Sequence, residues 1–145
     1  MTVRRSSFDA IGTKWNIVVR ETIATDVWEG LLLRIYERIQ EFDEVYSRFR
    51  DDSLVHQMSL KAGAYTLPAD GYKLLGFYEK LYGATNGKVT PLIGRAMSDA
   101  GYDAEYSFEH KQMQLPPKWE EAISYDEQSI TLGRPVLLDF GAAGK

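Results

Sequence analysis

The sequence predicts a mixed α+β fold, with a mixed or antiparallel sheet, one long amphipathic helix and several shorter helices. Apolar residues recur at steps of three and four from residue 27 to residue 49, which indicates the long helix. Short apolar or alternating segments near both ends of the chain, separated by turn-forming residues, indicate strands. A chain of 145 residues with 44% hydrophobic and 26% charged residues fits one globular domain.

The first elements are a hairpin and the long helix. Residues 7–21 are expected to form the hairpin, because apolar side chains alternate over residues 15–19 and Gly12 can supply the turn. Thr25 or Asp26 is the expected N-cap of the long helix. We expect the apolar stripe of this helix to lie in the core. The stripe consists of Val27, Trp28, Leu31, Leu32, Ile35, Ile39, Phe42, Tyr46 and Phe49.

Shorter elements are expected in the middle of the chain. The Asp-Asp-Ser segment at residues 51–53 should end the long helix and cap a short helix over residues 54–58. A brief strand is expected at residues 64–67. Pro68 then opens a third helix, which the Asn-Gly pair at residues 86–87 ends.

The last third of the chain is expected to contain one more helix and three strands. Pro91 begins a short helix over residues 91–97. Residues 103–118 carry few apolar positions and two adjacent prolines, so an irregular connection is expected there. The strands are expected at residues 122–125, 129–132 and 136–139.

The end of the sequence is its most distinctive local feature. The predicted strand leads into Asp139, a run of four small residues at 141–144, and Lys145. Small residues let a backbone approach a phosphate closely, and a following helix normally presents its N–H groups to the anion. No helix is expected after this strand. The segment therefore indicates a phosphate- or metal-binding turn, although a tight turn with Asp139 as a cap explains the same residues.

Composition excludes several classes of function. The net charge of −4 argues against nucleic acid as a partner, because phosphate binding needs a basic face. The absence of cysteine excludes disulfides, thiolate catalysis and cysteine-ligated metals. His56 and His110 have no metal-ligand spacing. No apolar stretch is long enough to span a membrane and no secretory signal is visible at the start, so a cytoplasmic location is expected.

Several short motifs resemble, in order and spacing, the N-terminal half of the FAD:protein FMN transferases, also called ApbE-type flavin transferases. They extend over the whole chain, and each motif alone is weak. The matching segments are Phe-Asp-Ala-Ile-Gly-Thr at residues 8–13, residues 42–53 around Ser-Arg-Phe, Thr-Asn-Gly-Lys-Val-Thr-Pro-Leu-Ile-Gly at 85–94, Gly-Tyr-Asp at 101–103, and Leu-Asp-Phe-Gly-Ala-Ala-Gly-Lys at 138–145.

The resemblance implies a T-fold-like architecture and a phosphoryl-type transfer. Enzymes of this family use Mg²⁺ and pass FMN from FAD to a threonine or serine hydroxyl of a target flavoprotein. The resemblance implies that the backbone carbonyl of Ala142 binds the metal. It also implies FAD contacts by Ile11, Phe49, Lys88, Val89, Thr90, Asp139 and Lys145.

The C-terminal half of the family's domain, which carries further metal ligands and a histidine motif, is absent from residues 1–145. We therefore expect the chain alone to be inactive or nearly so, or to need a complementing half. Uncovered apolar faces and sheet edges would favour self-association. The alternative function is a short FAD-binding or interaction module that keeps the scaffold without catalysis. Single residues also have simpler explanations: Lys88 as a surface lysine, Ile11 as a hairpin residue, and residues 47–50 as a solvated helix end.

Overall fold

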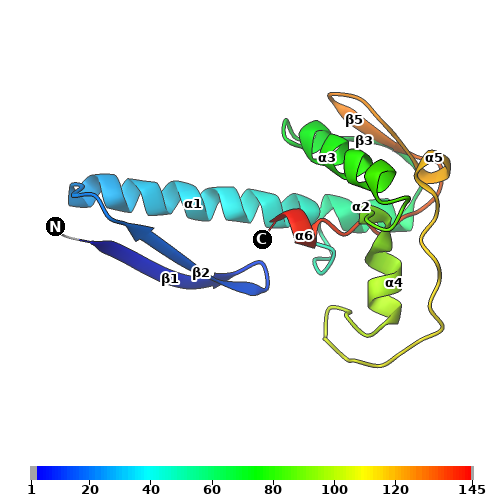
Figure 1. Cartoon of the computed structure of the whole chain (residues 1–145), viewed down its shortest axis with the longest axis horizontal. Helices are drawn as coiled ribbons and strands as arrows, with labels where there is room; N and C mark the ends of the chain where they lie inside the picture. Colours follow the sequence, from blue (N-terminus) through cyan, green and yellow to red (C-terminus); the bar gives the residue numbers. More distant parts are fainter. Residues whose placement is uncertain (1–2, 145) are drawn as a thin grey trace.

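The structure is a computed structural model that describes residues 3–144. Figure 1 shows a long helix that projects from a cluster of shorter elements, with a two-stranded hairpin beside its projecting part. We call residues 4–41 the arm and residues 42–144 the lobe. The α+β class predicted from the sequence is confirmed.

The hairpin of the arm pairs β1 (Arg4–Ala10) with β2 (Thr13–Val19) in antiparallel register. Because Ala10 pairs with Thr13, the loop has two residues, Ile11 and Gly12. Both have positive φ angles, 48° and 65°, as a type I′ turn requires. The predicted hairpin is confirmed, but it begins earlier than expected and places a β-branched residue in the left-handed region, where such residues are rare.

Helix α1 (Thr25–Tyr46) ends before the apolar stripe predicted for it, which runs to Phe49. Its N-cap is Ala24, not Thr25 or Asp26, and no side chain caps it; the Thr25 hydroxyl instead accepts a hydrogen bond from Arg4 at 2.8 Å. At the other end Ser47 is extended, so Phe49 lies outside the helix.

The prediction that the whole stripe of α1 is core is wrong. Within the helix only Trp28 and Tyr46 are buried, and Val27 is 54% exposed. The last turns, with Phe42 and Val45, pack against the lobe, whereas the first two-thirds has only the hairpin beside it. Periodicity located the apolar side of the helix, but along the arm the hairpin alone covers that side, and it leaves Leu31 and Ile35 only half-buried.

The lobe contains a three-stranded antiparallel sheet in the order β3-β5-β4 and the helices around it. The strands are β3 (Gly63–Thr66), β4 (Ile123–Tyr125) and β5 (Ser129–Leu132). Ser53 caps α2 (Leu54–Leu60), as predicted, by accepting the His56 N–H at 3.0 Å. Helix α3 (Gly71–Ala84) begins three residues after Pro68.

The strand predicted at residues 136–139 is not formed. The segment is extended and its burial alternates, but it pairs with no strand of the described chain. Instead the Val136 N–H donates to the Met58 carbonyl at 3.1 Å, and the Asp139 N–H donates to the Pro91 carbonyl at 2.7 Å. The segment thus lies between two helical elements, and the apolar alternation reflects burial without a ladder.

The remaining elements are short. Pro91 opens a 3₁₀ turn, η1 (Pro91–Ile93), which leads into α4 (Gly94–Asp99). Residues 103–118 are irregular, as predicted. The structure adds two helices that the sequence did not predict, α5 (Trp119–Ala122) and α6 (Gly141–Gly144).

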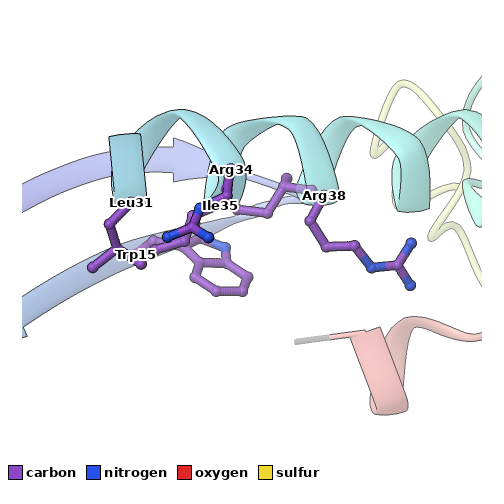
Figure 2. A pocket seen from close by; sticks show the side chains of 6 residues that line it. Trp15, Leu31, Arg34, Ile35 and Arg38 are labelled. Atoms are coloured by element: carbon purple, nitrogen blue, oxygen red, sulfur yellow. The ribbon is translucent and has the colours of Figure 1, made fainter. Parts of the chain in front are cut away.

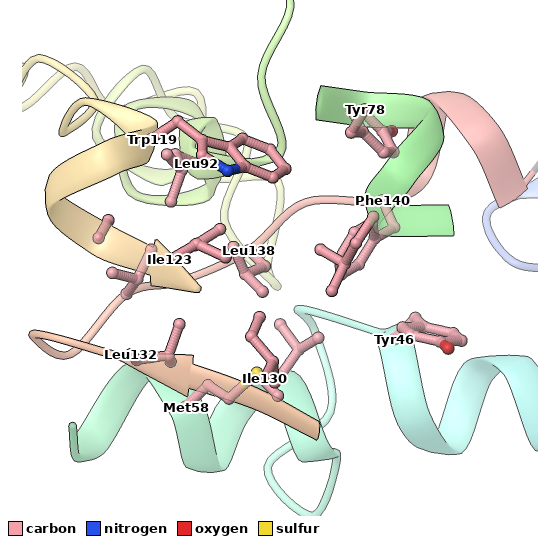
Figure 3. Packing of buried hydrophobic residues seen from close by; sticks show 14 of the residues in the cluster. Tyr46, Met58, Tyr78, Leu92, Trp119, Ile123, Ile130, Leu132, Leu138 and Phe140 are labelled. Carbon is pink, nitrogen blue, oxygen red and sulfur yellow. The ribbon is translucent and has the colours of Figure 1, made fainter. Parts of the chain in front are cut away.

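The core of the molecule lies entirely in the lobe (Figure 3). Side chains from the end of α1, from α2, α3, η1, α5, the sheet and the 136–140 segment meet there. Its most deeply buried large apolar members are Val55, Met58, Leu75, Leu92, Ile130, Leu132 and Leu138.

Candidate functional site

A buried ion pair joins the end of the long helix to the terminal turn. The Arg48 Nε donates to Asp139 Oδ2 at 2.8 Å, and the two side chains are only 8% and 17% exposed. Arg48 also donates to the Tyr102 carbonyl, and its guanidinium carbon lies 4.1 Å from the centroid of the Phe49 ring. One arginine therefore connects three of the segments that the sequence singled out.

The second oxygen of Asp139 organises the turn that follows it. Asp139 Oδ1 accepts the Gly141 N–H at 2.8 Å. Helix α6 begins at Gly141, so the expectation that no helix follows is wrong. Asp139 accepts the N–H of this first helical residue from two positions upstream, in an Asx turn. Ala142 lies in α6 and is exposed. Lys145 lies outside the described residues.

The segment at residues 85–91 lies beside the same turn, through the hydrogen bond from Asp139 to Pro91. The Thr85 hydroxyl accepts the Val89 N–H at 3.0 Å, which holds the loop after α3. Lys88 and Val89 are exposed, whereas Thr90 is buried and its hydroxyl accepts the Leu92 N–H at 3.1 Å. Thr90 therefore caps η1, and of these three residues only Lys88 and Val89 present side chains to solvent.

Phe49 and Tyr106 form an exposed aromatic pair, and Tyr106 also lies close to the hairpin turn. Phe49 stacks on Tyr106 with ring centroids 5.7 Å apart, and the two side chains are 39% and 48% exposed. The Tyr106 hydroxyl would lie 3.6 Å from a Cβ placed on Gly12. The loop that carries Tyr106 therefore connects Phe49 with the strained turn at Ile11.

The structure thus brings most of the predicted residues to the junction of arm and lobe. Phe49 and Asp139 meet through Arg48, and Thr90 is one residue from the carbonyl that Asp139 contacts. Ile11 is linked to them only indirectly, through Gly12 and Tyr106.

Sequence reasoning missed Arg48, which it explained as part of a solvated helix end. The residue is buried because its carboxylate partner comes from a segment 91 positions away. Its place inside the Ser-Arg-Phe motif was the available signal. Nothing local in the sequence indicates the pairing.

The donor set for Mg²⁺ is incomplete within the described part of the chain. No cluster of three or more histidine, aspartate or glutamate side chains there could hold a metal ion. Both oxygens of Asp139 are already engaged, by Arg48 and by Gly141. A short helix leaves its carbonyls without intrahelical partners, so Ala142 can offer one oxygen, whereas Mg²⁺ needs six.

A groove on the arm lies apart from these residues. Trp15 from β2 faces Leu31 and Ile35 from α1 across it, and Arg38 lies at its lobe end (Figure 2). Arg38 forms an ion pair with Asp70 of the lobe. None of the predicted ligand residues lines this groove.

Among residues 3–144, no helix is long and apolar enough to cross a membrane.

Comparison of the structure with solved structures shows a shared fold. The apo form of the flavinyl transferase ApbE from Pseudomonas stutzeri is 15% identical with a TM-score of 0.72, and the match covers 97% of this chain and 50% of that one. A variant of the flavin transferase ApbE from Vibrio cholerae is 16% identical with a TM-score of 0.82, covering 100% and 53%. The ApbE protein from Thermotoga maritima is 15% identical with a TM-score of 0.74, covering 99% and 48%.

The chain thus has the fold of the ApbE flavin transferases and spans about half the length of each of these structures. The model of the ApbE family matches residues 11–145, so the chain belongs to the ApbE family. No curated protein matches the sequence significantly. The family resemblance read from the short motifs is confirmed.

Proposed function

We propose that the protein serves the transfer of FMN from FAD to a threonine or serine hydroxyl of a target flavoprotein. The observation that carries this proposal is the Arg48–Asp139 ion pair, because it joins two family motifs in one buried contact. The flavin transferases named above share the fold over the whole of this chain but are about twice as long. In this proposal, residues 1–145 form the N-terminal portion of a flavin-transferase domain and supply part of its FAD site.

The proposed FAD site lies along the junction of arm and lobe. Phe49 is 39% exposed but its ring already contacts Arg48 and Tyr106, so a base would stack on it in place of Tyr106. Lys88 offers a positive charge to a phosphate. Arg48 compensates the charge of Asp139, so that an anionic diphosphate can approach the turn at residues 139–143. Ile11, Val89, Thr90 and Lys145 complete the set that the family resemblance implies.

Mg²⁺ belongs to this proposal as a cofactor with ligands beyond the described residues. The Ala142 carbonyl would be one ligand, and the substrate diphosphate and water would supply others. A bound Mg²⁺ neutralises charge that develops on a transferred phosphoryl group. Because the described residues hold no complete site, we propose that the chain alone does not catalyse the transfer and that a complementing C-terminal half is required.

The proposal is tested by titrating FAD fluorescence with the 145-residue chain, with and without Mg²⁺, followed by an FMN-transfer assay with an acceptor flavoprotein. We expect saturable but weak FAD binding and no repeated turnover. Absence of saturable binding would contradict the proposed site. Multiple turnovers by the chain alone would contradict the need for a second half.

The alternative is an FAD-binding or interaction module without catalysis, for which the apolar groove of the arm offers a surface. Addition of a separately produced C-terminal half of an ApbE protein distinguishes the two functions, because restored transfer excludes the alternative. The cytoplasmic location, self-association and the absence of a nucleic-acid partner stay predictions from the sequence.

A further inference from the structure

The irregular connection between α4 and α5 carries several exposed apolar side chains. It spans residues 103–118, the yellow trace in Figure 1, and contains no helix or strand. Its large apolar residues, between 48% and 88% exposed, are Tyr106, Phe108, Met113 and Leu115. Ordered loops of this length without secondary structure are uncommon and usually functional, and exposed apolar clusters mark sites of interaction. The connection is therefore expected to do more than join two helices.

The first part of the connection is a closed and strained loop. Asp103 accepts the Ser107 N–H at 2.9 Å and the Ser107 hydroxyl at 2.6 Å. The Phe108 N–H donates to the Gly101 carbonyl at 3.0 Å. Within this loop Tyr106 and Phe108 have φ angles of 48° and 53°, in the left-handed region that residues other than glycine rarely adopt. Strain of this kind is concentrated at sites that bind ligands, so it points to a function of the loop.

The strained loop presents the Tyr106 ring to Phe49. The two rings stack with an interplanar angle of 29° and with their centroids 5.7 Å apart. The Tyr106 hydroxyl lies beside the hairpin turn, 3.6 Å from a Cβ placed on Gly12. A planar ring of the chain itself thus occupies the space between Phe49 and the turn at Ile11, two residues that the proposed FAD site assigns to the ligand.

We propose that Tyr106 is a specificity-determining residue that competes with a planar ring of the ligand, the adenine or the flavin of FAD, for the stacking position on Phe49. The inference rests on the proposed function and adds a residue to its site. The hydrogen bonds of Asp103 and Gly101 hold the backbone of the loop, so it does not rise by the thickness of a ring. Tyr106 therefore leaves Phe49 by rotation of its side chain and does not stack on the outer face of the bound ring.

The expected consequence is that the free chain binds ring ligands less tightly than Phe49 alone would allow. A contact changes affinity only through the difference in its strength between the free and bound states. The stack of Tyr106 on Phe49 exists in the free chain and is broken in the complex, which lowers the affinity about fivefold for an aromatic pair. Only fused rings that stack more strongly than a phenol then bind through Phe49.

The test compares Tyr106→Ala with Phe108→Ala in the 145-residue chain, by the Kd for FAD, ADP and FMN. Both substitutions remove an exposed ring at a left-handed residue of the same loop, but only Tyr106 stacks on Phe49. We expect Tyr106→Ala to lower the Kd for FAD about fivefold and Phe108→Ala to leave it unchanged. The Kd for ADP falls in parallel if adenine takes the place of Tyr106, and the Kd for FMN falls if flavin does. Tyr106→Phe keeps the competing ring and should keep the Kd of the unsubstituted chain.

An unchanged or raised Kd for FAD in Tyr106→Ala overturns the inference, because Tyr106 would then lie outside the site or add to it. An equal gain in Phe108→Ala overturns it as well, because a loosened loop would then explain the gain. In both cases FAD still binds, so the proposed function stands. If neither the unsubstituted chain nor any variant binds FAD, the inference and the proposed function both fail.

Discussion

The arm and the lobe carry the same kind of apolar pattern but bury it to different extents. In the lobe, Leu75 of α3 and Ile130 of β5 are 1% and 0% exposed. In the arm, the stripe of α1 has equally regular spacing, yet its first member, Val27, is 54% exposed and Trp28 is the only buried side chain of the helix before its last turn.

The difference follows from the number of layers that each region has. Elements from the end of α1 to the 136–140 segment, including α2, α3, η1, α5 and the sheet, enclose the core of the lobe. The arm has one helix and one hairpin, and a two-stranded hairpin alone is at best marginally stable. Periodicity therefore tells which side of a helix is apolar, whereas burial depends on whether another layer is present to cover it.

The largest effect is expected where arm and lobe meet, at the buried Arg48–Asp139 pair. Arg48→Ala leaves the carboxylate of Asp139 buried without its cation, so the free energy of unfolding should fall by about 3–5 kcal/mol. Urea denaturation of the chain measures this. Arg34→Ala, at an exposed arginine of the arm, is the matched control and should change stability by less than about 0.5 kcal/mol.

A double variant distinguishes structural from functional loss at this pair. Arg48→Met combined with Asp139→Leu replaces the ion pair with apolar side chains and should recover most of the stability. FAD binding should not recover. If FAD binds to the double variant as to the unsubstituted chain, the ion pair has no role in the proposed site.

The comparison of burial itself is tested by two truncations. Ile130→Ala removes a fully buried side chain from the lobe and should lower the free energy of unfolding by about 2–5 kcal/mol. Val27→Ala in the stripe of the arm should change it by less than about 0.5 kcal/mol. Both values come from the same denaturation experiment. A loss of more than about 2 kcal/mol for Val27→Ala would show that the stripe of the arm is covered in solution, as self-association would require.

The smallest effect is expected at the hairpin turn of the arm. Ile11→Asn creates an Asn-Gly pair, which suits the two positive φ angles of the type I′ turn. Relief of the left-handed strain at a β-branched residue should stabilise the hairpin by about 1 kcal/mol. Amide hydrogen exchange of β1 and β2 measures the change. Faster exchange in the variant would show that the packing of the Ile11 side chain outweighs its backbone strain.

Local sequence signals predicted most elements of the fold. The hairpin, the Ser53 cap and the irregular connection at residues 103–118 all depend on residues close together in sequence, and each is confirmed. The strand at residues 136–139 was predicted from the same kind of pattern and is not formed. Its alternation comes from packing between α2 and η1, which a sequence pattern cannot distinguish from strand pairing.

The candidate site was predicted only in part, through family resemblance. The motifs named Phe49, Thr90 and Asp139, and the structure places them at one junction. They did not assign a role to Arg48. This residue pairs with Asp139, 91 positions away, and such distant pairing leaves no periodic signal in the sequence.

By itself, the sequence determined the α+β class, the order of most helices and strands, and the membership of the ApbE family. These depend on backbone preferences, periodicity and motif spacing, which act over short stretches of chain. Only the tertiary structure decided which apolar stripe is buried, that Asp139 is neutralised by Arg48, and that the hydroxyl of Tyr78 has no hydrogen-bond partner among residues 3–144. Burial and pairing depend on which residues the fold brings next to each other. Many of these neighbours, such as Arg48 and Asp139, are far apart in the sequence.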